Sequence, residues 1–155
     1  GVKWDVLWGP KLVDAAVVRR AIRELLQDSD RDVGIELYAN LQAVFLQGMP
    51  AVVMAHVRTF CEVLLSRLLL RGGATNDEIA RASLADLVRY AIDRALFPSE
   101  TITTTFYTVA LFANKLYRLP LESSGYKGTV VASLVSGLKI TVEEALVDWS
   151  NACHK

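Results

Sequence analysis

The sequence predicts an all-α protein, a single-domain helical bundle of five to seven helices arranged around a central helix near residues 50–71. Two observations support this prediction. Apolar residues recur at three- and four-residue spacing along most of the chain, which is the period of one face of an α-helix. In segment 50–71 apolar residues cover most of the circumference, as in a helix that other helices surround.

The composition is that of one independently folding unit. The chain has 155 residues, 52% of them apolar, so we expect residues 1–155 to form a single helical domain, which could be a fragment of a longer protein. Seventeen basic and seventeen acidic residues cancel, so any contact with nucleic acid must come from a local patch. Two cysteines are too few for a disulfide framework, and no apolar run reaches the length of a membrane span. We therefore expect a cytoplasmic protein with no membrane partner.

The first half of the chain predicts three helices. The first is expected to start at Pro10 and to end before the polar run 28–32. The second is expected over 33–47, closed by Gly48, and the central helix follows over 50–71. The residues that the first helix is expected to turn inward are Leu12, Ala15, Val18, Ile22 and Leu25.

The segment after the central helix predicts two more helical stretches. Residues 76–78 supply caps and first-turn acids for a helix that restarts at Ser83 and ends at Phe97–Pro98. Its expected inward residues are Leu84, Leu87, Val88, Ile92 and Leu96. The β-branched run 101–109 would also suit a strand, but we predict a helix because a lone strand would have no partner.

The C-terminal part is expected to contain a loop and a last helix. Gly125 and Gly128 predict the loop, and the apolar segment 129–138 is of uncertain type. Thr141 and Glu144 have the spacing of a capping box, so the last helix is predicted to begin there.

The sequence offers no set of residues for catalysis or for metal binding. His56 and Cys61 are five residues apart, which places them on different faces of a helix and does not match zinc-site spacings. Cys61 lies among apolar residues and is expected to be a core thiol. The usual nucleophile and phosphate-binding motifs are missing. We therefore expect no catalytic residue, no metal and no cofactor, and a protein that is not an enzyme.

Two groups of polar residues are candidates for binding. The central helix has one polar stripe, formed by His56, Thr59, Glu62 and Ser66. Its residues either make structural hydrogen bonds or face a partner, or they line a cleft in which His56 titrates. The first helix has a basic patch, which is either a solvated face or a contact for phosphates. The residues of this patch are Lys11, Arg19, Arg20 and Arg23.

Three stretches, over residues 50–69, 83–92 and 140–149, resemble the core helices of the HEPN superfamily, small helical domains of prokaryotic ribonucleases, toxins and phage-defence proteins. The first contains an R-x-x-x-E element, here Arg58 and Glu62. The ribonucleases of that family place an arginine and a histidine five to seven residues apart. Arg118 stands in the matching region, but no histidine follows it at that spacing. The resemblance therefore implies a helical dimerisation or binding domain without ribonuclease activity.

The sequence favours a non-enzymatic helical module for protein–protein interaction or dimerisation, whose partner is another protein or a second copy of the chain. The alternative is an RNA- or nucleotide-associated HEPN-like domain that uses the basic patch. The residues expected to contribute to binding outside that patch are His56, Arg58, Thr59, Glu62, Arg118 and Lys127.

Overall fold

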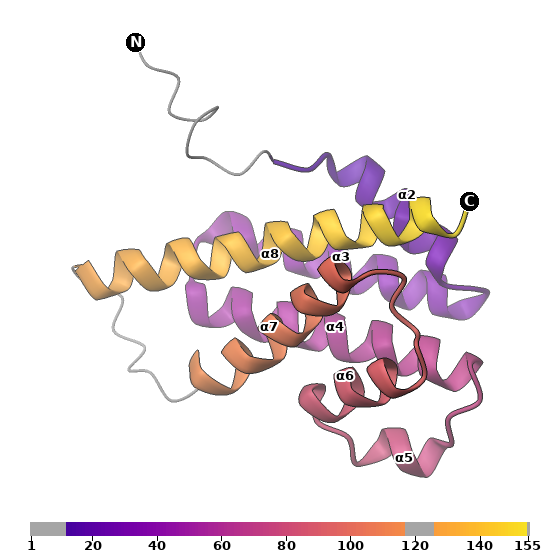
Figure 1. Ribbon diagram of the computed structural model, residues 1–155. Helices are drawn as coiled ribbons and strands as arrows, with labels where there is room; N and C mark the ends of the chain where they lie inside the picture. Colours follow the sequence, from indigo (N-terminus) through magenta and orange to yellow (C-terminus); the bar gives the residue numbers. More distant parts are fainter. Residues whose placement is uncertain (1–11, 117–125, 155) are drawn as a thin grey trace.

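Seven α-helices and no strand make up the part of the chain that the structure, a computed structural model, describes, namely residues 12–116 and 126–154 (Figure 1). The helices are α2 (Ala15–Leu25), α3 (Ser29–Gln47), α4 (Pro50–Arg71), α5 (Asn76–Ala80), α6 (Leu84–Asp93), α7 (Glu100–Leu116) and α8 (Tyr126–Ala152). The predicted all-α bundle is thereby confirmed.

Helix α4 is the centre of the bundle, as predicted. Pro50 occupies its first turn, where a missing N–H costs nothing, and Gly72 follows its last residue. The helix contacts α3, α5, α6, α7 and α8. Its buried residues are Val53, Met54, Val57, Phe60, Cys61, Leu64, Leu65, Leu68 and Leu69. None of the helices described is both long and apolar enough to span a membrane.

Helix α8, the last described helix, packs against α2, the first described helix. It runs along the bundle beside α2 and α7 and also contacts α4 (Figure 1). Tyr38 of α3 contacts Glu143, and Phe45, two turns later, contacts Lys139, so α3 and α8 run antiparallel. The C-terminal end of α8 lies against α2, through a hydrogen bond from Ser150 to Glu24.

The first two helices begin at other residues than predicted. Helix α2 begins at Ala15 because the carboxylate of Asp14 accepts a hydrogen bond from Ala16 N at 2.9 Å and caps it. Leu12 precedes the helix and is 78% exposed, so its assignment to the inward face is wrong. Pro10 lies outside the described residues. Helix α3 begins at Ser29, so the polar run 28–32 opens this helix rather than separating two helices.

The predicted restart at Ser83 is confirmed, because Ser83 and Asp86 form a reciprocal capping box that opens α6. Thr75, rather than Asn76, caps α5 through its side chain. Helix α6 ends at Asp93, four residues before the predicted end. Ile92 lies in its last turn and is 45% exposed, so its predicted place in the core is wrong.

The C-terminal half is more regular than predicted. Run 101–109 is helical within α7, as expected. Helix α8 is continuous from Tyr126 to Ala152, so the predicted loop at Gly128 and the predicted helix start at Thr141 are both wrong. Thr141 Oγ1 donates to Gly137 O at 2.6 Å, a bond inside the helix and not a cap. Gly125 lies outside the described residues.

Candidate interaction surface on α7

One face of α7 presents a straight row of exposed side chains. Spacings of three and four residues place Glu100, Thr104, Tyr107, Leu111 and Lys115 on the same side of the helix. We call these five residues the α7 row. Tyr107 and Leu111, in its middle, are 52% and 43% exposed although both are large and mainly apolar. An acidic residue closes one end of the row and a basic residue closes the other.

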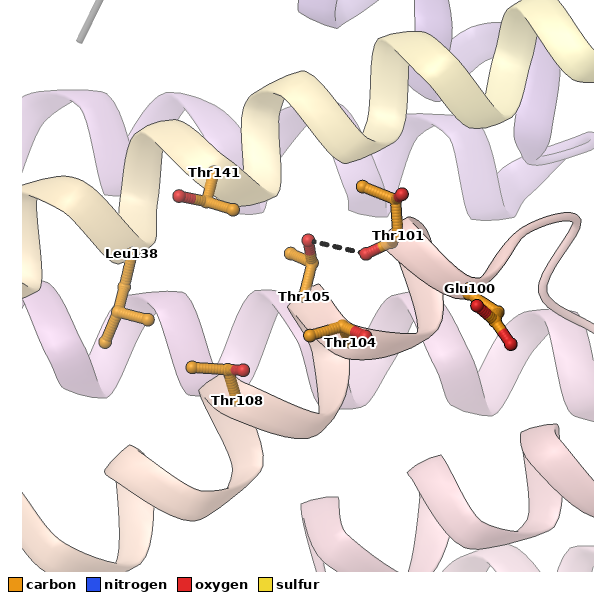
Figure 2. A pocket seen from close by; sticks show the side chains of 7 residues that line it. All are labelled: Glu100, Thr101, Thr104, Thr105, Thr108, Leu138 and Thr141. Carbon is orange, nitrogen blue, oxygen red and sulfur yellow. Dashed lines mark hydrogen bonds between the residues drawn. The ribbon is translucent and has the colours of Figure 1, made fainter.

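A hollow of about 410 Å³ lies beside the α7 row, between α7 and α8. Figure 2 shows Thr105 pointing from α7 toward α8 and Leu138 pointing from α8 toward α7, with Glu100 at the opposite end from Leu138. The side chains that line the hollow are Glu100, Thr101, Thr104, Thr105, Thr108, Leu138 and Thr141. Two of them, Glu100 and Thr104, also belong to the α7 row, so the row and the hollow form one continuous surface.

The chemistry of the hollow is set by its threonines. Thr105 is buried, and its hydroxyl donates to Thr101 O at 3.1 Å (Figure 2). On the facing helix the hydroxyl of Thr141 donates within α8. Because these two donors are used by their own helices, the walls at these positions offer methyl groups more than free hydrogen-bond donors. Such a surface suits an apolar or aromatic side chain better than a charged small molecule.

A second group of exposed apolar residues lies at the turn between α3 and α4. Leu46 and Met49 are 86% and 59% exposed, and Leu46 is in the last turn of α3. Val130, near the start of α8, is also exposed. None of these residues lines the hollow, so they are not an extension of the α7 row.

The candidate binding residues on α4 lie close together but not at the hollow. His56 is half-buried, with Nδ1 2.9 Å from Val52 O, one turn earlier in the helix. Arg58 and Glu62 form a partly exposed ion pair, with 3.5 Å between Arg58 Nε and Glu62 Oε1. Thr59 is exposed. The structure thus brings Arg58 and Glu62 into contact, as a pair one turn apart on a helix surface.

The basic patch falls mainly on the outer face of α2. Arg20 and Arg23 are exposed, Arg19 is half-buried, and none of the three forms an ion pair with another described residue. Lys11 and Arg118 lie outside the described residues, as does the side chain of Lys127. The structure therefore places three of the predicted cations on one helix.

Sequence reasoning missed a polar cluster that joins α2 to the end of α8. Glu24 Oε2 accepts hydrogen bonds from Ser150 Oγ and from His154 Nε2, the latter at 3.0 Å. The hydrogen bond from Ser150 first, and then the one from His154, hold the pKa of Glu24 below its ordinary value. Ser150 and His154 both form a hydrogen bond with the carboxylate of Glu24 rather than with each other. The cluster therefore lacks the serine–histidine hydrogen bond that activates a nucleophilic serine.

Sequence reasoning also missed a buried polar network between α3 and α8. The hydroxyl of Tyr38 donates to Glu143 Oε2, and Lys139 Nζ lies 4.3 Å from the ring centroid of Phe45. Burial, followed by the hydrogen bond to Glu143, raises the pKa of the Tyr38 hydroxyl. Burial also raises the pKa of Cys61, which lies in the core as predicted.

Among residues 12–116 and 126–154, no three potential metal ligands come together. Comparisons with protein-family models, with curated proteins and with solved structures return no match.

Proposed function

We propose that this chain is a non-enzymatic helical module that binds protein through the α7 row. The observation that supports the proposal most directly is the exposure of Tyr107 and Leu111, two large side chains one turn apart beside a hollow. Contiguous apolar surface next to a concavity is typical of protein–protein contacts. Tyrosine is also one of the residue types on which interface energy concentrates.

The surroundings of these two residues fit the same role. Threonines flank them on the side of the hollow, so an incoming side chain meets methyl groups as well as hydroxyls. Glu100 and Lys115 lie at the rim, where charged groups contribute more to specificity than to affinity. A polar rim around an apolar centre is the usual arrangement of a protein interface.

The proposal is tested by placing a charge in the middle of the row. We expect Leu111→Glu to abolish association of the protein, since a carboxylate in a desolvated contact has no partner. Association is measured by sedimentation velocity over a range of concentrations, and by affinity capture of proteins from a cell extract. The matched control is Ile92→Glu on α6, because Ile92 is exposed to nearly the same extent as Leu111.

The decisive result is a difference between the two variants. Self-association, or capture of one defined protein, that Leu111→Glu loses and Ile92→Glu retains supports the proposal. If Leu111→Glu behaves like the wild type in both assays while Leu46→Glu does not, the binding surface is the α3–α4 turn and the proposal is wrong.

A second candidate function is RNA binding through the basic patch, which is also the form that the resemblance to HEPN domains would take. It is favoured by the position of Arg19, Arg20 and Arg23 on one helix without an ion-pair partner among the described residues. Binding of labelled single-stranded RNA that weakens steeply with added salt, and that Arg20→Glu/Arg23→Glu abolishes, would support it. We expect no cleavage of the RNA.

A further inference from the structure

Residues of the α7 row are spaced symmetrically about one point in the sequence. The point midway between Tyr107 and Thr108 is also the midpoint of Thr104 and Leu111, and of Glu100 and Lys115. Two pairs of row residues, Thr104 with Leu111 and Glu100 with Lys115, are therefore related by this point, and the counterpart of Tyr107 is Thr108, which lies next to the row. An antiparallel copy of the same helix, related by a two-fold axis through this point, would bring each pair together.

The paired residues complement one another in size. In this arrangement Leu111 of one copy lies opposite Thr104 of the other, so a large apolar residue meets a small one. Tyr107 lies opposite Thr108, which is half-buried and lines the hollow. Large residues facing small ones interdigitate, and the hollow gives the ring of Tyr107 from the second copy a place to enter.

The charges at the ends of the row also pair. Glu100 of each copy would lie opposite Lys115 of the other, twice in one interface because of the two-fold axis. Neither residue forms an ion pair with another residue in the described part of the chain. A parallel arrangement would instead place like charges together at both ends, so the charges select the antiparallel one.

We infer that the partner of the α7 row is the α7 row of a second copy of this chain, packed antiparallel about a two-fold axis between Tyr107 and Thr108. The inference rests on the proposed function and specifies its partner. It goes beyond an apolar contact because it fixes the direction and the register of the two helices.

The test exploits the repeated charge pair. In Glu100→Lys both ends of the row are basic, and in Lys115→Glu both ends are acidic. Each variant alone should dimerise with a dissociation constant raised about tenfold or more, since every interface then contains two like-charge contacts. A one-to-one mixture of the two variants restores both opposite-charge contacts, so it should form heterodimers with near wild-type affinity. The double variant Glu100→Lys/Lys115→Glu should also recover self-association.

Matched controls carry the same charge changes away from the row. Asp93→Lys and Arg81→Glu alter exposed residues on and beside other helices, and both should dimerise like the wild type. All proteins are compared by sedimentation velocity, after circular dichroism has shown equal helix content. If Glu100→Lys does not fold, the neutral Glu100→Gln replaces it, and the expected result is a smaller loss of affinity that no longer depends on salt.

The outcomes separate this inference from the proposed function. Single variants that dimerise normally, while Leu111→Glu does not, overturn the register and leave protein binding by α7 standing. A wild-type protein that stays monomeric at high concentration also overturns the inference. The proposed function is then supported only if a different protein is captured by the wild type and lost in Leu111→Glu. Loss of dimers in Leu46→Glu but not in Leu111→Glu overturns both.

Discussion

Lys139 and Glu143 form an ion pair inside the bundle, one turn apart on α8, with 2.8 Å between Lys139 Nζ and Glu143 Oε1. Their side chains are only 5% and 2% exposed. Tyr38 from α3 donates to the other carboxylate oxygen, and the ring of Phe45 faces the ammonium group. The two charges are therefore satisfied by each other and by α3, and each depends on the other for its place in the core.

Removing one member of this pair is expected to destabilise the fold strongly. Lys139→Met leaves the Glu143 carboxylate buried without a cation, which should lower the free energy of unfolding by about 3–5 kcal/mol. In Lys139→Met/Glu143→Gln the buried charge is gone and the amide can still accept from Tyr38, so the loss should be smaller. Urea denaturation measures both. A double variant that is less stable than Lys139→Met would contradict this account.

Replacing two of the glycines by alanine should change the stability of the protein in opposite directions. A Cβ atom at Gly34 would lie 2.6 Å from Leu26 Cδ1 and 3.0 Å from Ile22 Cγ2, so Gly34→Ala should overpack the α2–α3 contact and cost up to about 2 kcal/mol. At Gly137, in the interior of α8, a Cβ atom would meet nothing within 4 Å. Gly137→Ala should therefore stabilise the protein by about 0.5–1 kcal/mol through helix propensity. Thermal denaturation of the pair compares them directly, and equal shifts would refute the packing at Gly34.

Shortening a buried side chain of the central helix should lower the stability of the fold substantially. Leu65 is fully buried on α4, and Leu65→Ala is expected to lower the free energy of unfolding by about 2–5 kcal/mol. Leu46→Ala, at a position that is largely exposed, should change it by less than about 0.5 kcal/mol. A loss below half a kcal/mol at Leu65, measured by chemical denaturation, would place that residue outside the core.

Glu24 should contribute to stability in a way that depends on pH. Because its pKa is lower in the folded protein than in the unfolded chain, its contribution is complete above the unfolded value, about 4.5, and disappears as the pH falls through the folded value. Ser150→Ala removes the hydrogen bond that lowers the pKa most, so the Glu24 pKa should rise. Carboxyl carbon shifts in an NMR titration report this. An unchanged pKa in Ser150→Ala would mean that the hydrogen bond is not formed in solution.

The elements that the sequence predicted well are those with local signals. Pro50 and Gly72 bound α4, and the capping residues at Ser83 open α6, because each acts on its own few residues. Helix α8 was misjudged for the same reason. Gly128 and the Thr141–Glu144 spacing are local signals for a break, but packing along the whole helix outweighs them.

The candidate site depends on tertiary packing that sequence patterns do not predict. Thr105 and Val109 are buried one turn apart on α7, but no exposed face with Tyr107 was predicted from this spacing. The hollow beside it depends on how α8 packs against α7, which no local pattern contains. Lys139 and Glu143 were missed because such residues are ordinarily exposed, although their position among Leu138, Ile140 and Val142 was a usable signal.

The packing of α2 against α8 has a consequence for synthesis of the chain on the ribosome. Among the described helices α2 leaves the ribosome first, yet it packs against α8, a helix that is translated more than a hundred residues later. Until α8 has left the exit tunnel, the main neighbour available to α2 is α3. Docking of α2 against α8 therefore waits until α8 has emerged, and nascent chains stalled before residue 126 should expose apolar surface that a chaperone can bind.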